Sequence, residues 1–200
     1  MINVIGLLGA AGAGKTTVSQ YLVDKYGAVR YSFAYPLKQI AQNTLGFTDE
    51  QLYGTQEQKE AIDPRYGFSP RWFLQKLGTE GIRSVFGEDI WWENCLKRIK
   101  EDQPALVVID DFRFINEVNG FLNAKDRTTM RRATMTHMWR IESPVRGSEA
   151  DPTHQSEAEW MLAQYTHLIK PEKYGLEHLL DVVDKNANAC GLLPTVAVLP

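Results

Sequence analysis

The sequence predicts an α/β fold in which a parallel sheet of about five strands is covered by helices on both faces. Residues 2–8 form a continuous apolar run, as expected of a central strand buried on both faces. A glycine-rich turn follows, and residues 15–26 then carry apolar side chains at helical spacing. A second apolar run, residues 105–109, ends in two aspartates. These observations indicate successive strand-loop-helix units of one sheet.

The turn between the first strand and the first helix carries a nucleotide-binding motif. Residues 9–16 fit the pattern G-x-x-x-x-G-K-[ST], which defines a P-loop when it joins a strand to a helix. Glycines let backbone amides close around phosphates, and the helix N-terminus favours negative charge. We expect Lys15 to reach the β and γ phosphates and Thr16 to offer a hydroxyl to Mg²⁺. The predicted ATP-binding set is Gly9, Ala11, Gly12, Ala13, Gly14, Lys15, Thr16 and Thr17.

The strand at residues 105–109 predicts a carboxylate ligand for the metal. It ends in Asp110 and Asp111, and an acidic residue at the end of an apolar strand is typical of a Walker-B carboxylate. Either aspartate could instead cap the following helix, so the residues alone leave the choice open.

Composition limits the class of protein. The chain has 200 residues, 44% of them hydrophobic, which suits one domain with a sizeable core. Its formal charge of -3 gives no general attraction to nucleic acid, and no apolar stretch reaches the length of a membrane span. Cys95 and Cys190 show no metal-binding spacing, so we expect two reduced thiols that bind no metal. A cytoplasmic protein is predicted, with the oligomeric state, a homodimer included, left open.

Local patterns predict the other elements. Residues 48–70 are polar and interrupted by glycine and proline, which indicates a short helix and a mobile loop. The remaining predicted strands are 29–33, 133–141 and 167–169, and the remaining predicted helices are 36–45, 70–86, 89–100, 114–122, 156–165 and 174–188.

Several short blocks, in a constant order, resemble the phage-type deoxynucleoside monophosphate kinases. The resemblance covers roughly residues 5–160. Its blocks are FAYPLK at 33–38, LYG at 52–54, SPR at 69–71, LQKLGTE at 74–80 with Arg83, DFRFINE at 111–117 and HQSE at 154–157. The resemblance implies Mg²⁺-dependent phosphoryl transfer from ATP to a (deoxy)nucleoside monophosphate. In a host infected by a phage, such an enzyme would work in the cytoplasm.

A phosphate acceptor requires a second cationic pocket, because an incoming dianion must approach the γ-phosphate in line. The resemblance assigns base or sugar contacts to Gln75, Thr79 and Glu80, and makes Asp111 rather than Asp110 the metal ligand. The cationic candidates for binding the acceptor are Lys38, Arg71, Arg83 and Arg113. The expected catalytic set is Lys15, Asp111, Arg113 and Arg146, with Thr16 and Asp111 as metal ligands.

The resemblance also implies how the chain is organised. We expect a single P-loop kinase domain at 1–190, with an acceptor-binding helical region at 38–100 and a tail at 191–200. Residues 142–155 are expected to be a lid over the triphosphate, which would exclude water from the reaction.

Two other functions remain open at this stage. A P-loop kinase acting on a hydroxyl of a modified base in DNA would need a general base and a basic groove. Asp110 or Asp111 could supply the base, and residues 125–132 the groove. A nucleotide-binding switch protein without catalysis is the third reading. Formation of ADP that depends on an acceptor distinguishes the three.

Overall fold

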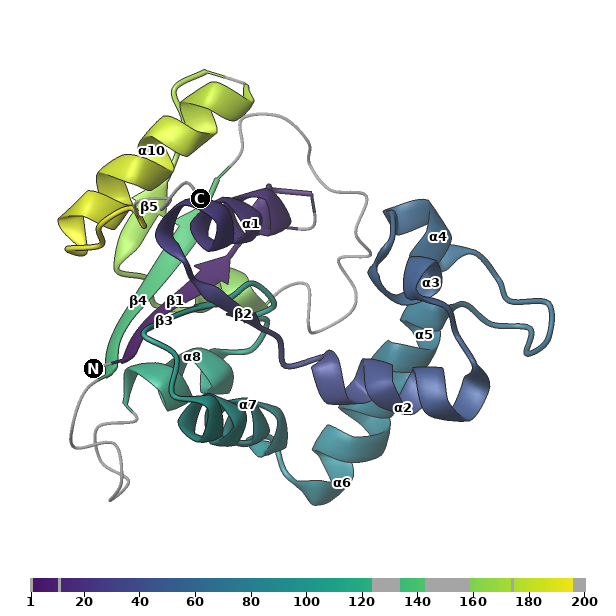
Figure 1. The fold of residues 1–200 in the computed structure, drawn as a ribbon. Helices are drawn as coiled ribbons and strands as arrows, with labels where there is room; N and C mark the ends of the chain where they lie inside the picture. The colour runs from purple at the N-terminus through teal and green to yellow at the C-terminus, as the bar shows by residue number, and fades with distance from the viewer. Residues whose placement is uncertain (1, 11, 124–133, 143–158, 174, 196–200) are drawn as a thin grey trace, which may run out of the picture. The chain divides into compact units, whose positions relative to one another are not determined.

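The computed structural model describes residues 2–10, 12–123, 134–142, 159–173 and 175–195 (Figure 1). The chain divides into two compact units. The larger comprises Met1–Ser32 and Cys95–Pro200, and the smaller comprises Phe33–Asn94. The larger unit holds the whole sheet, whereas the smaller unit is built from helices and one isolated β-bridge.

The sheet confirms the predicted α/β fold. Its five strands are β1 (Ile2–Leu8), β2 (Val29–Tyr31), β3 (Leu106–Ile109), β4 (Thr134–Ile141) and β5 (His167–Ile169). They lie in the order β2-β3-β1-β4-β5, and every neighbouring pair is parallel. Gly6 is in register with Ile109, and Leu8 with Arg140. The carboxyl ends of β1, β3 and β4 therefore meet at one edge, where open parallel sheets bind their ligands.

Helices cover both faces of this sheet (Figure 1). The elements are α1 (Lys15–Tyr26), α7 (Ile90–Asp102), α8 (Ile115–Leu122), a 3₁₀ turn η3 (Glu159–Leu162) and α10 (Leu176–Ala189). Helix α7 starts in the smaller unit and continues into the larger one. On one face, Leu22 of α1 and Val183 of α10 join a buried cluster with Ile5 and Trp139. Burying each such aliphatic side chain contributes about 1.5–3 kcal/mol, so this cluster anchors both helices to the sheet.

Two glycines have separate structural roles: one ends α1, and the other lets side chains pack closely on β1. Gly27 adopts a left-handed conformation with φ 67°, and its N–H bonds the carbonyl of Val23 at 3.1 Å. A Cβ added to Gly6 would lie 2.6 Å from both Met138 and Phe112. The central strand therefore needs glycine at position 6 to let these side chains pack over it.

The smaller unit is a set of short helices. They are α2 (Tyr35–Leu45), α3 (Asp49–Tyr53), α4 (Gln56–Glu60), α5 (Pro70–Gln75), a π-helix η1 (Lys76–Arg83) and α6 (Ser84–Phe86). Ala41, Phe47 and Leu52 form its buried centre. Pro36 in the first turn of α2 and Gly46 at its end agree with the prediction, because proline suits a helix start and Gly46 has φ 63°.

The predicted helix at 70–86 contains a π-helical segment that the sequence did not indicate. Ser69 caps its start by accepting the N–H of Trp72, and Pro70 occupies the first turn, as predicted. Residues 76–83 then widen into the π-helix. A Cβ on Gly78 would lie 2.7 Å from Leu37, and the carbonyl of Gly78 accepts the indole N–H of Trp91 at 2.9 Å. Packing on both sides of Gly78 thus accompanies the altered helical path.

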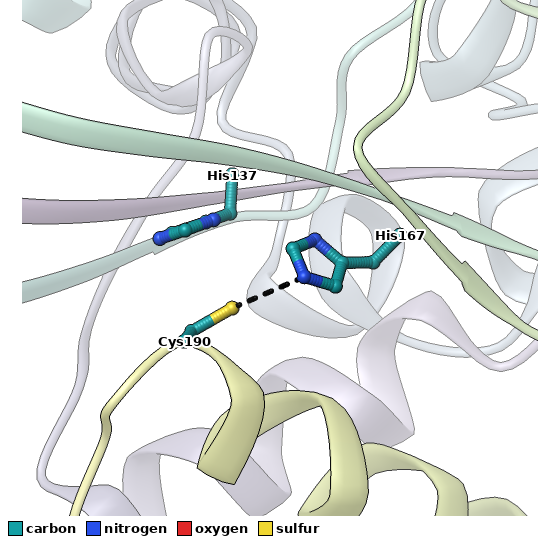
Figure 2. Close-up of side chains that lie close together, drawn as sticks. All are labelled: His137, His167 and Cys190. Carbon is teal, nitrogen blue, oxygen red and sulfur yellow. Dashed lines mark hydrogen bonds between the residues drawn. The ribbon is translucent and has the colours of Figure 1, made fainter.

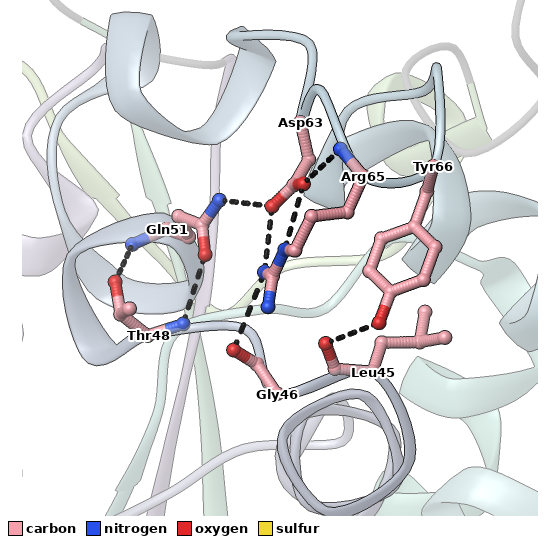
Figure 3. A network of polar contacts seen from close by, with 7 residues as sticks. All are labelled: Leu45, Gly46, Thr48, Gln51, Asp63, Arg65 and Tyr66. Atoms are coloured by element: carbon pink, nitrogen blue, oxygen red, sulfur yellow. Dashed lines mark hydrogen bonds and ion pairs between the residues drawn. The ribbon is translucent and has the colours of Figure 1, made fainter.

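Residues 48–70, predicted to be a short helix and a mobile loop, contain the two short helices α3 and α4 and a turn held by the buried Asp63 (Figure 3). Its carboxylate accepts hydrogen bonds from Gln51 Nε2 at 2.9 Å and from the N–H, Nε and Nη2 of Arg65 at 2.9, 2.9 and 2.7 Å. Tyr66 donates its hydroxyl to the carbonyl of Leu45 at 2.8 Å. The bonds from Arg65 and Gln51 hold the pKa of Asp63 well below its usual range.

Two further predictions can be compared with the structure. Only the 3₁₀ turn at 159–162 is helical in the described part of the predicted helix 156–165. Among the described residues, no helix combines the length and the apolar character that a bilayer span requires.

Candidate active site

The loop between β1 and α1 is shaped by its glycines. Gly9 has φ 156°, and a Cβ there would lie 2.9 Å from the carbonyl oxygen of Ile141 and 3.3 Å from Ala13 Cβ. Gly12 and Gly14 have φ 76° and 99°, and Gly14 is the residue from which α1 starts. Positive φ values are accessible to glycine at little cost. The loop therefore turns sharply against β4 and directs the N-terminus of α1 toward the sheet edge.

Lys15 turns its side chain back over this loop. Its Nζ donates to the carbonyl oxygens of Gly9 at 2.6 Å and Ala10 at 2.7 Å. Thr16 and Thr17 follow in the first turn of α1 and are exposed. The first turn contains no acidic residue, so a positive charge and two hydroxyls lie together at a helix N-terminus. Ala11, which belongs to the predicted set, lies outside the described residues.

The two aspartates after β3 have different surroundings. Asp110 is buried, and its Oδ2 lies 2.5 Å from Nη2 of Arg30 in an ion pair. Burial and the neighbouring charge of Asp111 raise the pKa of Asp110, and the Arg30 guanidinium opposes that rise. Asp111 is only half-buried and accepts a hydrogen bond from the hydroxyl of Ser32 at 2.7 Å.

Strand pairing explains these contacts. Arg30 and Tyr31 of β2 are in register with Val108 and Ile109 of β3, so the two carboxylates emerge beside the end of β2. Arg98 adds a hydrogen bond at 2.6 Å to the carbonyl of Ser32. Sequence reasoning missed Arg30, Ser32 and Arg98, because no local pattern shows which strand lies beside β3.

Arg113 lies between Asp111 and the start of α8. Its main-chain N–H and that of Phe114 both donate to Oε2 of Glu117, at 2.8 and 3.0 Å. Glu117 is buried and thus satisfies two donors at the helix start, which is one half of a capping box. The N–H of Ile115 donates to the Glu159 carboxylate at 3.3 Å. These bonds fix the backbone that carries the half-buried Arg113 side chain.

The other predicted acceptor-binding residues lie in the smaller unit. On α2, the Lys38 ammonium lies 3.9 Å from the centroid of the Tyr53 ring. Arg71 of α5 pairs with Glu60 at 3.7 Å. Glu80 pairs with Lys76 at 2.6 Å on the exposed side of the π-helix.

Three more predicted residues lie at α5 and the π-helix. Gln75, the last residue of α5, and Thr79, within the π-helix, are half-buried. Arg83 is buried, and its guanidinium donates to the carbonyl of Glu88 at 3.0 Å. The smaller unit thus gathers Arg71, Gln75, Thr79, Glu80 and Arg83 on one continuous helical segment.

In the larger unit, the P-loop and the aspartates come together at one sheet edge, because β1 and β3 are neighbours and both end there. Thr16, Lys15, Asp111 and Arg113 all follow strand ends at this edge. Arg146 and the predicted lid, except for Glu142, lie outside the described residues, and so do residues 125–132.

Comparisons with known proteins agree with the resemblance seen in the sequence. No protein-family profile matches the chain. A protein of Acanthamoeba polyphaga mimivirus named "Putative deoxynucleotide monophosphate kinase" is 36% identical over 171 residues, which cover 78% of this chain and 81% of that protein. A "Deoxynucleoside-5'-monophosphate kinase" of Escherichia phage T5 is 28% identical over 176 residues, with coverage of 58% and 70%.

A solved structure shares the fold. The tunicamycin resistance protein of Deinococcus radiodurans matches with a TM-score of 0.52 and 13% identity, covering 98% of this chain and 99% of that one. At this identity the match concerns architecture alone. The sequence match to the mimivirus protein extends across most of both chains, and the described elements supply a P-loop and a strand-end aspartate. The chain belongs to the deoxynucleotide monophosphate kinase family.

Proposed function

We propose that this protein transfers the γ-phosphoryl group of ATP, with Mg²⁺, to the phosphate of a deoxynucleoside monophosphate and so forms ADP and a deoxynucleoside diphosphate. The observation that carries the proposal is the position of Lys15, whose ammonium lies over the glycine loop at the edge where β3 delivers Asp111. Membership of the kinase family supports the same reaction.

The loop fits a triphosphate. The Cβ position at Gly12 has no atom within 4 Å, so the loop has open space where its backbone turns. The Lys15 ammonium donates hydrogen bonds to two loop carbonyls. A triphosphate bound in the loop would bring phosphate oxygens within reach of the same ammonium, which would then bind them in place of the carbonyls. We assign ATP binding to the loop amides, Lys15, Thr16 and Thr17.

Magnesium fits the oxygen donors at this edge. Thr16 offers an exposed hydroxyl and Asp111 a half-buried carboxylate, and Mg²⁺ prefers such hard oxygen ligands with water completing its shell. When bound, the ion would neutralise charge on the β and γ phosphates. Asp110 is less suited to this role, because Arg30 already neutralises it within the fold.

The acceptor phosphate is assigned to arginine. Arg113 follows Asp111 by two residues at the end of β3, and its planar guanidinium can hold a phosphate through two parallel hydrogen bonds. Lys38, Arg71 and Arg83 are proposed as additional cationic contacts, and Gln75, Thr79 and Glu80 as contacts to base and sugar. No general base is required, since the attacking phosphate oxygen is already anionic; positioning and electrostatics supply the catalysis.

The proposed organisation has one kinase domain at 1–190, an acceptor-binding helical region at 38–100 and a lid at 142–155 that carries Arg146. Closure of the lid would exclude water, which protects ATP from hydrolysis until the acceptor is bound.

An acceptor panel tests the proposal. The protein is incubated with Mg-ATP and, separately, each common deoxynucleoside and ribonucleoside monophosphate, single-stranded DNA and duplex DNA, and the products are resolved by chromatography. We expect diphosphate and ADP in equal amounts with at least one deoxynucleoside monophosphate. Phosphate incorporated into DNA alone would indicate a hydroxyl kinase, and ATP binding without transfer to any acceptor would indicate a switch protein; either result overturns the proposal.

A further inference from the structure

Three side chains with metal-binding groups converge within the larger unit. His137 comes from β4, His167 from β5, and Cys190 follows the last residue of α10 (Figure 2). One ligand atom on each residue lies within 4.8 Å of those on the other two. The Nε2 atom of His167 lies 3.7 Å from Sγ of Cys190, and the two imidazole centroids are 5.4 Å apart.

Hydrogen bonds of Thr166 bear on which nitrogen of His167 carries the proton. The Thr166 hydroxyl lies 3.1 Å from the carbonyl oxygen of Met138 and accepts the N–H of Met138 at 3.0 Å. The same hydroxyl oxygen lies 2.8 Å from Nδ1 of His167. A hydroxyl has one proton, so Thr166 either donates to Met138 and accepts the N–H of Nδ1, or donates to Nδ1 itself. A metal ion on Nε2 requires the first arrangement. Nε2 then carries a lone pair directed toward Cys190.

His137 supplies a second imidazole. Its Nε2 is buried and has no hydrogen-bond partner among the described residues. Buried polar atoms are rarely left without a partner, because the lost hydration is not recovered. A coordinated ion would satisfy this nitrogen.

We infer that His137, His167 and Cys190 form a binding site for Zn²⁺. Two imidazole nitrogens and one thiolate are ligands that zinc prefers, and three protein ligands with a water in the fourth position make a tetrahedral site. Bond lengths of about 2.0–2.1 Å to nitrogen and about 2.3 Å to sulfur place N and S about 3.6 Å apart at the tetrahedral angle. The spacing of 3.7 Å between His167 and Cys190 fits this value. Binding releases the thiol proton to solvent, because the thiolate is the ligand.

The surroundings of the site match those of known zinc sites. A metal-bound histidine commonly donates its other N–H to a fixed acceptor, which holds the ring in place and favours the correct tautomer. Thr166 serves this purpose for His167.

The position of the site indicates a structural role. His137 is in register with Ile5 on β1, and the P-loop begins after Leu8. Ile5 and Leu8 are three residues apart along β1, which corresponds to roughly 10 Å. His167 is in register with Trp139, which pairs with Leu7, but β5 lies two strands from β1, or roughly 10 Å at the usual strand spacing. The ion would therefore join the end of α10 to β4 and β5 at a distance from the P-loop. Sequence spacing could not reveal the site, since its ligands come from three separate elements.

Cobalt provides the direct test, since Co²⁺ bound to a thiolate absorbs through a charge-transfer band. The reduced, metal-free chain without nucleotide is titrated with Co²⁺, and bound Co²⁺ is then displaced with Zn²⁺. We expect the band to saturate at one Co²⁺ per chain and to disappear as Zn²⁺ is added. Cys190→Ser should abolish the band, and His167→Gln should weaken binding more than the ~10–100-fold expected for Thr166→Val, which removes only the supporting acceptor.

Two control variants separate this site from other thiols and imidazoles. Cys95 is fully buried and has a pKa raised to about 12 by burial, and His178 is exposed. Cys95→Ala and His178→Gln should both keep the wild-type band and affinity. Zn²⁺ should also raise the melting temperature of the wild type but not that of Cys190→Ser.

A reduced wild type that gives no charge-transfer band would overturn the inference and leave only a thiol–imidazole hydrogen bond. An equal band in Cys190→Ser would also overturn it. Neither result bears on phosphoryl transfer, because the titration contains no nucleotide.

Discussion

Nη2 of Arg30 lies 2.5 Å from Oδ2 of the buried Asp110, and this ion pair distinguishes two adjacent aspartates. Asp110 is neutralised within the fold, across the β2–β3 pair. Asp111 accepts a hydrogen bond from Ser32 and is half-buried at the strand end. The ion pair therefore occupies the first carboxylate and leaves the second better placed for a metal.

Substituting each aspartate should separate these roles. We predict that Asp111→Asn raises the Mg²⁺ concentration needed for half-maximal turnover more than Asp110→Asn does. Asp110→Asn should change the free energy of unfolding little at pH 7, because burial raises the pKa of Asp110 and so offsets the attraction of Arg30, whose side chain is 42% exposed. Mg²⁺ titrations of the initial rate and urea unfolding of both variants measure the two effects. A larger Mg²⁺ defect in Asp110→Asn would contradict the assignment.

Arg113→Lys tests the acceptor site. The variant keeps the positive charge but loses the planar fork, so the KM for the monophosphate should rise much more than the KM for ATP. The main-chain N–H of residue 113 can still donate to Glu117, so the start of α8 should survive. Steady-state kinetics with each substrate varied in turn provide the measurement. Equal increases in both KM values, with a lowered melting temperature, would make Arg113 a structural residue.

Asp63 should make the stability of the smaller unit depend on pH. Its pKa is lowered in the folded state, so the charged form stabilises the fold above the unfolded-state pKa of about 3.9. That contribution should decline as pH falls below about 4 and vanish below the lowered folded-state pKa. Wild type should therefore exceed Asp63→Asn in stability at pH 5–7, and the difference should shrink with acid. Thermal unfolding from pH 7 down to about pH 2 measures it; a difference that stays constant below about pH 4 would rule out the carboxylate as its source.

Gly9→Ala should damage the nucleotide loop. The new Cβ would lie 2.9 Å from the carbonyl oxygen of Ile141, which backbone pairing holds in place. Gly67→Ala is a matched control, since that glycine also has positive φ but no atom within 4 Å of its Cβ position. We expect a higher Kd for ATP in Gly9→Ala alone, and a cost of about 1–2 kcal/mol from the backbone conformation in the control. Calorimetric titration with ATP compares the two variants, and unchanged affinity in Gly9→Ala would show that the loop tolerates a side chain.

The sequence predicted those features whose determinants are local. The apolar run of β1, the glycine motif after it and the proline at the start of α2 lie within a few residues of the structures that they specify. The contacts between β2 and β3 could not be predicted in the same way. Arg30 and Asp110 are 80 residues apart, and only the strand order makes them neighbours.

Two other features also depended on tertiary packing. The π-helix at 76–83 forms where Leu37 and Trp91 pack against Gly78, and both lie outside the helical segment that they contact. Cys190 was expected to bind no metal, because neither histidine near it in the fold is near it in the sequence.

Phosphoryl transfer at the P-loop is most directly tested by Lys15→Ala. The measurement is the initial rate of deoxynucleoside diphosphate formation from Mg-ATP and the best monophosphate acceptor, with the melting temperature recorded for every variant. Lys25→Ala is the control on the same helix, since Lys25 pairs with Asp184 at 2.6 Å and its loss should affect stability rather than turnover. Loss of the Lys15 charge should lower the rate by about 100-fold or more, or roughly 3 kcal/mol of transition-state stabilisation, with little change in melting temperature. Wild-type turnover by a folded Lys15→Ala variant would contradict the account.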